Sequence, residues 1–112
     1  MDELIWQGLL FDFYGDLLTE TQRAVFSEYV NEDFTITEIA QRRGVSRQSI
    51  HEALKRTEAV LTGYEETLGL IAKFTDAKVK LEALRETISG LSVEAATREM
   101  LWCRIDEIMD GM

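Results

Sequence analysis

Apolar residues recur at helical spacing along the whole chain, and no stretch shows the strict alternation of a strand. Residues 2–18 carry leucine, isoleucine and aromatic side chains with acidic residues between them, which predicts an amphipathic helix with a broad apolar face. Residues 19–31 begin with a Thr-x-x-Gln capping box and predict a second helix. The pattern therefore opens with two supporting helices, followed by a short polar loop.

Residues 35–56 predict two short helices joined by a tight turn. Thr35 and Glu38 have the spacing of a capping box, in which each side chain accepts the backbone N–H of the other residue. The first helix then has one apolar face, formed by Ile36, Ile39 and Ala40.

The turn and the second helix complete a helix-turn-helix. Gly44 stands where the first helix must end, a position that favours a residue able to adopt positive φ. We expect Val45 to fill the angle between the helices and Ser46 to cap the second one. Ile50 and Leu54, four residues apart, give that helix its buried stripe.

The outward positions of the second helix are polar, as in a helix that reads the major groove of DNA. Arginine pairs with guanine and glutamine with adenine, whereas lysine, hydroxyl groups and further arginines hold phosphates. The predicted nucleic-acid-binding residues are Arg42, Arg43, Ser46, Arg47, Gln48, His51, Glu52 and Lys55. The alternative is that these residues form an ordinary solvent-exposed face on a domain that has the helix-turn-helix shape but does not bind DNA, since fold alone does not define function.

The distribution of charge restricts where nucleic acid could bind. The chain has a net charge of −9, with −7 in residues 1–35, +3 in residues 36–56 and −5 in residues 57–112. Because most of the molecule repels phosphates, binding would depend on the basic patch and would weaken with salt.

Composition bounds the fold class and the compartment. The 112 residues include no proline and are 46% apolar, which predicts an all-α protein. We expect a helix-turn-helix domain over residues 1–63 and C-terminal helices over residues 64–112. The chain has one cysteine, no apolar run of 18 residues and no signal-peptide pattern, so a cytoplasmic location is expected. Cys103 follows a helical pattern and is interpreted as a small core residue.

The C-terminal part contains a second strong pattern. Apolar residues recur at steps of four and three, as in the a and d positions of three heptads. They are Leu70, Phe74, Ala77, Leu81, Leu84, Ile88 and Leu91. This seam could pack against the last helix in an αα-hairpin over residues 66–110, or form a dimer interface. Gly63 could end the preceding helix, or that helix could run through it.

Several short segments together resemble the YlxM family of small bacterial helix-turn-helix proteins. The segments lie between about residues 4 and 80, and the helix-turn-helix itself is also similar to region 4 of sigma factors. They are residues 10–14 (LFDFY), 17–19 (LLT), 22–23 (QR), 38–40 (EIA), 45–48 (VSRQ), 55–58 (KRTE) and 64–65 (YE). Ser49 and His51 depart from the alanine and tyrosine that are common in the family.

The resemblance implies an all-helical, dimeric protein whose gene lies beside those of the signal recognition particle in many bacteria. It also implies a DNA-binding, transcription-regulating protein that takes part in the signal recognition particle pathway. A rival interpretation is a protein that does not bind DNA and contacts a basic protein of the particle through its acidic surfaces and the broad apolar face of residues 4–18. A third is binding of the particle's RNA through the same basic patch that would bind DNA. No phosphate loop, metal cluster or nucleophile motif is present, so we expect neither catalysis nor a cofactor, a metal or a membrane partner.

Overall fold

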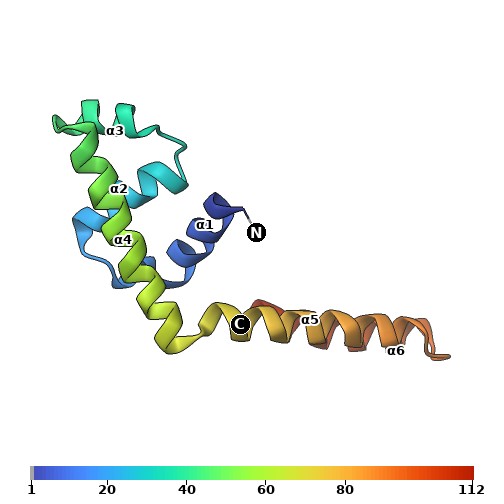
Figure 1. The fold of residues 1–112 in the computed structure, drawn as a ribbon. Helices are drawn as coiled ribbons and strands as arrows, with labels where there is room; N and C mark the ends of the chain where they lie inside the picture. The colour runs from blue at the N-terminus through green and yellow to red at the C-terminus, as the bar shows by residue number, and fades with distance from the viewer. Residues whose placement is uncertain (1) are drawn as a thin grey trace. The chain divides into compact units, whose positions relative to one another are not determined.

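The computed structural model describes residues 2–112 and confirms an all-α protein, with six α-helices, one 3-10 turn and no strand in that range. None of the helices in this range is both long enough and apolar enough to cross a membrane. The residues form two compact units, the first ending at Ile71 and the second spanning Ala72–Met112. The elements in order (Figure 1) are α1 (Glu3–Tyr14), the 3-10 turn (Gly15–Leu17), α2 (Glu20–Val30), α3 (Ile36–Arg43), α4 (Arg47–Leu68), α5 (Leu70–Ser89) and α6 (Ala95–Asp110).

The first helix is shorter than the apolar pattern predicts. It ends at Tyr14, and the chain continues through the 3-10 turn into Leu18, which is extended and buried. Thr19 is also extended, as its role in the capping box of α2 requires, and it accepts the backbone N–H of Gln22 at 3.2 Å. The 3-10 turn and the extended Leu18 thus lie between the end of α1 and the cap of α2 at Thr19.

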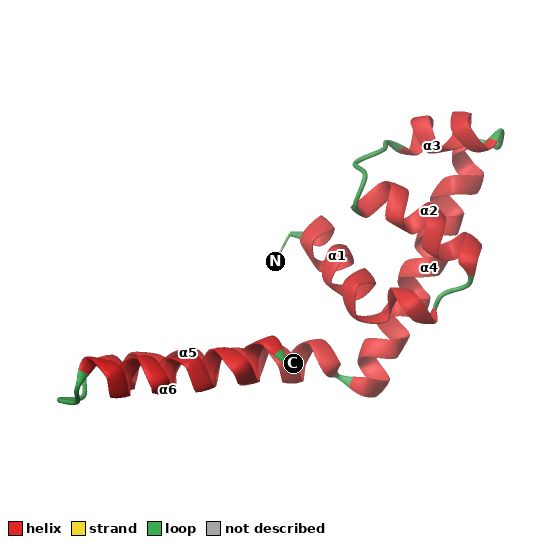
Figure 2. Ribbon diagram, turned by 180° about the vertical axis from the view of Figure 1, so that it is seen from behind, coloured by secondary structure: helices red, strands yellow, loops and turns green. Residues whose placement is uncertain are grey.

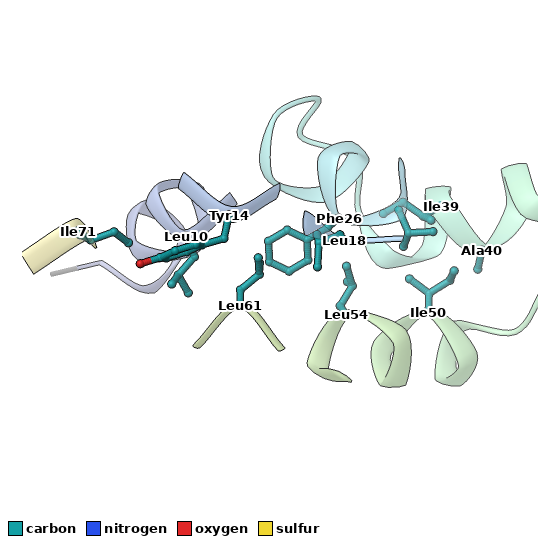
Figure 3. Close-up of a cluster of buried hydrophobic side chains, with 11 residues drawn as sticks. Leu10, Tyr14, Leu18, Phe26, Ile39, Ala40, Ile50, Leu54, Leu61 and Ile71 are labelled. Atoms are coloured by element: carbon teal, nitrogen blue, oxygen red, sulfur yellow. The ribbon is translucent and has the colours of Figure 1, made fainter. Parts of the chain in front are cut away.

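One side of α4 forms the centre of the first unit. Ile50, Leu54, Thr57 and Leu61 are buried at helical spacing, and α1, α2 and α3 each pack against this helix. Figure 3 shows the apolar side chains of α4 facing those of the other helices. The remaining buried core residues of the cluster are Leu10, Tyr14, Leu18, Val25, Phe26, Ile39, Ala40 and Ile71.

The end of α4 lies beyond the glycine that could have stopped it. The helix runs through Gly63 and ends at Gly69, which has a left-handed φ of 63°. The first unit therefore extends past residue 63, and its last residue is Ile71. An added Cβ at Gly63 would meet nothing within 4 Å, so the site does not require glycine for space.

A buried tyrosine closes the junction between α4 and α5. The Tyr14 hydroxyl donates to Glu65 Oε1 at 2.5 Å and accepts the Leu70 N–H at 3.1 Å. Glu65 Oε1 also accepts the Ile71 N–H at 2.9 Å. These bonds satisfy two of the backbone N–H groups at the start of α5 that have no partner within the helix. The negative charge of Glu65 also interacts favourably with the positive end of the α5 dipole.

The second unit is a helical hairpin of α5 and α6, which run alongside each other in opposite directions (Figure 2). Arg85 on α5 forms a 2.6 Å ion pair with Asp106 on α6. The Arg85 guanidinium also lies 5.2 Å from the Trp102 ring, and Trp102 Nε1 donates to the Arg85 carbonyl at 3.3 Å. Near the loop, Arg98 donates to the Leu91 carbonyl at 2.7 Å. Polar bonds therefore fix the register of the hairpin between Arg85 and the loop.

The heptad seam is only partly covered within the hairpin. Ile88 is buried, and Phe74, Ala77 and Leu81 are half-buried, whereas Leu84 is 48% exposed. The other large apolar side chains that remain exposed are Leu70, Val79, Met100 and Ile108 on these helices and Leu91 and Val93 in the loop between them. Two helices leave apolar area uncovered because each can face only one neighbour.

The expectation that Cys103 is a core residue is wrong. Its side chain is exposed on α6, with Sγ 3.9 Å from Glu107 Oε1. On this helix the buried residue is Ile105, and Trp102 is half-buried. Cys103 follows Trp102 directly, and the helical rotation between them places its side chain on the solvent-facing side of α6.

Replacing Tyr14 with phenylalanine should lower the free energy of unfolding by about 1–3 kcal/mol, because Glu65 and the Leu70 N–H both lose a partner in a sheltered site. Urea denaturation followed by circular dichroism measures the change. Tyr64→Phe is the matched control, since the half-buried Tyr64 hydroxyl forms no hydrogen bond within residues 2–112. Equal losses for the two variants would contradict the role of the Tyr14 hydroxyl.

The stability of the wild type relative to Tyr14→Phe should also depend on pH in the alkaline range. Burial raises the pKa of Tyr14 above its ordinary value, and its hydrogen bond to Glu65 adds to the rise. Above about pH 10 the unfolded chain loses this proton while the folded chain keeps it, so stability falls as pH rises. The advantage of the wild type over Tyr14→Phe should therefore shrink above about pH 10.

Candidate nucleic-acid interface

The first helix of the helix-turn-helix begins and ends as its sequence predicts. Glu38 N–H donates to Thr35 Oγ1 at 3.1 Å, and Thr35 N–H donates to Glu38 Oε1 at 3.2 Å, which completes the capping box. At the other end Gly44 adopts a left-handed φ of 65°. The Val45 N–H bonds to the Ala40 carbonyl and the Gly44 N–H to the Gln41 carbonyl, the two bonds of a Schellman motif.

The expectation for Val45 is wrong, because this side chain is 45% exposed and does not fill the angle between the helices. The crossing is packed instead by Ile39 and Ala40 from α3 and Ile50 from α4, all of which are buried (Figure 3). The small side chain of Ala40 allows the two helices to approach closely. The turn therefore leaves Val45 at its surface.

The second helix starts at the predicted cap. Ser46 Oγ accepts the Ser49 N–H at 3.0 Å. The Ser46 hydroxyl still has a proton to donate, and backbone N–H groups in the first turn of α4 lack a helical partner. This end of the helix can therefore donate hydrogen bonds to an anion.

The first turns of α4 present a polar outer face opposite the buried Ile50 and Leu54. Gln48 Nε2 donates to Glu52 Oε1 at 3.1 Å, so two of the predicted nucleic-acid-binding residues are hydrogen-bonded to each other. The predicted residues that are exposed on this face are Ser46, Arg47, Gln48, His51, Glu52 and Lys55.

A surface depression of about 510 Å³ lies beside this face. Arg47, Gln48 and His51 line it from α4, and Ile36 and Thr37 line it from the first turn of α3. Sequence reasoning missed Thr37, although its position between the apolar Ile36 and Ile39 already marks it as an outward polar residue of α3. The depression brings donors and acceptors of both helices to one place.

Arg42 and Arg43, predicted to hold phosphates, are engaged by α2 in this structure. Arg43 Nε donates to Glu28 Oε2 at 3.0 Å, and Arg42 Nη2 lies 3.9 Å from Glu28 Oε1. The Arg42 guanidinium also stacks over the Phe34 ring, 4.4 Å from its centroid. Sequence reasoning missed Glu28, because only the folded chain brings residue 28 next to residues 42 and 43.

The remaining cations of the basic patch have no such partner. Arg47, Lys55 and Arg56 form no ion pair with any residue in the range 2–112. Arg56 lines a small groove of about 150 Å³ between α2 and α4, away from the depression lined by Arg47. Arg47 and Lys55 are therefore the unpaired cations among the predicted contact residues.

Comparison with known proteins agrees with this geometry. A family model described as "Putative helix-turn-helix protein, YlxM / p13 like" (UPF0122) matches residues 1–100. A UPF0122 protein of Halalkalibacterium halodurans is 41% identical over 108 residues, covering 96% of this chain and 95% of the relative. One of Symbiobacterium thermophilum is 42% identical over 99 residues, covering 88% and 92%. UPF0122 protein YlxM of Bacillus subtilis is 46% identical over 85 residues, covering 76% and 77%.

Two helices crossed at a left-handed glycine, with a capped second helix, define a helix-turn-helix protein. The chain belongs to the UPF0122 family of YlxM- and p13-like proteins. This confirms the resemblance inferred from short segments, and the match reaches beyond residue 80. The family is described by its helix-turn-helix and not by an enzymatic activity.

Two glycine substitutions should change stability in opposite directions. Gly44→Ala places a Cβ at a left-handed φ and should cost about 1 kcal/mol, whereas Gly63→Ala lies inside α4 with open space around it and should stabilise by about 0.5–1 kcal/mol. Thermal and urea denaturation of both variants measures the two shifts. A loss of stability in Gly63→Ala would mean that α4 does not run through that residue.

Proposed function

We propose that this protein is a cytoplasmic DNA-binding regulator that contacts DNA through the first turns of α4. The observation that carries the proposal is the polar outer face of this helix. Arg47, His51 and Lys55 are exposed on it and are not needed for packing. In helix-turn-helix proteins the same part of the second helix lies in the major groove.

Each side chain of this face has a distinct proposed role. Arg47 reads a guanine edge through two hydrogen bonds, and Gln48 reads adenine once it releases Glu52. Lys55 binds a phosphate as a point charge. The Ser46 hydroxyl and the start of α4 bind a second phosphate, and His51 adds a contact from the edge of the depression.

A dimer would compensate for the small charge of one basic patch. The chain carries −9 overall and only +3 in residues 36–56, so one copy should bind weakly. Two linked copies gain from the higher effective concentration of the second patch, provided that the patches are about 34 Å apart. The partly exposed seam, with Leu84 on α5 and Leu91 just beyond its end, offers the apolar surface for pairing.

The family resemblance extends the proposal to the signal recognition particle pathway, in which the regulator would take part. A second candidate function is direct contact with the particle's protein or RNA, without binding to DNA. The charge distribution favours contact with a basic protein, since residues 1–35 hold eight acidic residues and one basic residue. The acidic side chains exposed there are Asp2, Glu3, Asp12, Asp16, Glu20, Glu32 and Asp33. Such a surface would suit a basic protein partner.

Fluorescence anisotropy separates these functions. The purified protein is titrated against labelled DNA from upstream of its own gene, random DNA and the particle's RNA, at low salt and near ~150 mM salt. A preference for its own upstream DNA that persists at the higher salt supports the regulator. Binding to RNA alone, or to a basic subunit of the particle alone, supports the second candidate.

Arg47→Ala should abolish sequence preference, whereas Lys55→Ala should weaken specific and random DNA equally and reduce the salt dependence. The physical reason is that a base edge carries sequence information and a phosphate does not. Lys78→Ala in the second unit removes the same charge from an exposed position and should leave binding unchanged. Equal losses of preference for Arg47→Ala and Lys55→Ala would contradict the assigned roles.

Leu84→Asp should convert a dimer into a monomer, because it places a charge on the exposed part of the seam. Val79→Asp is the control: Val79 is also exposed on α5, at 59%, but lies off the heptad positions. Sedimentation equilibrium reports the mass of each protein. A wild-type monomer at all concentrations, or a dimer that survives Leu84→Asp, would rule out this interface.

A further inference from the structure

Glu28 on α2 forms the centre of a small cluster of charges beside the helix-turn-helix. Its two carboxylate oxygens face two different arginines, with Oε2 bonded to Arg43 Nε at 3.0 Å and Oε1 3.9 Å from Arg42 Nη2. The Phe34 ring supports the Arg42 guanidinium at 4.4 Å. One anion is therefore held between two guanidinium groups, which is also how proteins hold a phosphate.

The exposure of these side chains shows how an outside anion could reach the cluster. The Glu28 side chain is only 12% exposed, whereas those of Arg43 and Arg42 are 32% and 57% exposed. The carboxylate thus lies beneath the arginines, whose outer surfaces remain open to solvent. A DNA phosphate could approach the guanidinium groups without unfolding any element.

The position of the cluster connects it with the proposed interface. Arg42 and Arg43 end α3, and one turn of chain separates them from the cap of α4 at Ser46. With the Glu28 carboxylate included, the +3 of residues 36–56 falls to +2. The acid therefore weakens the field at the place where the proposed interface needs positive charge.

We infer that Arg42 and Arg43 form a phosphate-binding site in which Glu28 is the resident anion, and that Glu28 thereby limits affinity for nucleic acid. The inference rests on the proposed function. A backbone phosphate binds by displacing the Glu28 carboxylate from the arginines, and the ion pair re-forms when the nucleic acid leaves. The Arg42 and Arg43 side chains remain 57% and 32% exposed, so a phosphate can compete with the Glu28 carboxylate for their guanidinium groups.

The test compares Glu28→Gln with Glu32→Gln. Both variants remove one negative charge near the end of α2, but the exposed Glu32 side chain pairs with no residue in the range 2–112. Anisotropy with a fluorescein-labelled random DNA duplex should give three- to tenfold tighter binding for Glu28→Gln and less than about a twofold change for Glu32→Gln. The salt slope should steepen for Glu28→Gln, because in the wild type the displaced carboxylate takes up a cation when the phosphate binds, which offsets part of the counterion release.

A double variant shows whether the gain passes through the arginines. When Arg43 is already replaced by glutamine, adding Glu28→Gln should increase DNA affinity by no more than Glu32→Gln does in the native background. Equal binding by Glu28→Gln and Glu32→Gln in the native background would overturn the inference while leaving DNA binding itself intact. If the wild type binds no nucleic acid at low salt, the proposed function fails. In that case, DNA binding by Glu28→Gln but not by the wild type would still support the phosphate site. If Glu28→Gln also fails to bind DNA, the phosphate site is rejected together with the proposed function.

A measurement on the wild type covers the case in which Glu28→Gln does not fold, as thermal denaturation would reveal. The Arg43 Nε–H resonance is followed by NMR during titration with the same duplex, with Arg23 as an internal reference. Arg23 pairs with Asp16 at 3.4 Å and belongs to no proposed contact. A shift of Arg43 that saturates together with the anisotropy supports the exchange, and an Arg43 resonance that moves no more than that of Arg23 overturns it.

Discussion

The first unit depends on the burial of a single stripe along α4. Ile50, Leu54, Thr57 and Leu61 are the surface against which α1, α2 and α3 all pack, so no pair of those helices needs a large interface of its own. Because the stripe occupies one side of the helix, the opposite side at its start is free for polar residues. The same packing that stabilises the domain thus determines which side chains of α4 face outward, and a shift of the buried stripe by one residue would expose Ile50 and bury Lys55 or Arg56.

The features that the sequence predicts correctly are those formed within a few residues. Both capping boxes, the glycine at the end of α3 and the cap at Ser46 depend on contacts three to five residues apart, so the local pattern is sufficient. The end of α4 is different, since a glycine inside a helix costs only about 1 kcal/mol and tertiary packing can exceed that. Leu61 is fully buried just before Gly63, and Glu65 just after it bonds to Tyr14, so the helix gains contacts on both sides of the glycine.

Long-range contacts account for what the sequence does not reveal about the candidate interface. Arginines and lysines in residues 36–56 look equivalent in the sequence, but the fold brings Glu28 to Arg42 and Arg43 and leaves Arg47 and Lys55 unpaired. Glu52 similarly holds Gln48 on the outer face of α4. In the C-terminal part, heptad spacing identifies the apolar side of α5 but not the share of it that α6 covers, because that depends on how the hairpin packs.

The exposed position of Cys103 has a practical consequence for studying the assembly. The chain contains one cysteine, and it lies on the outer side of α6, away from the buried Ile105. A thiol-reactive spin label or dye would therefore attach at a single place without any substitution. Two labelled copies would report the separation of their hairpins by dipolar spectroscopy or energy transfer, so the native chain already carries the probe site needed to map how copies are arranged.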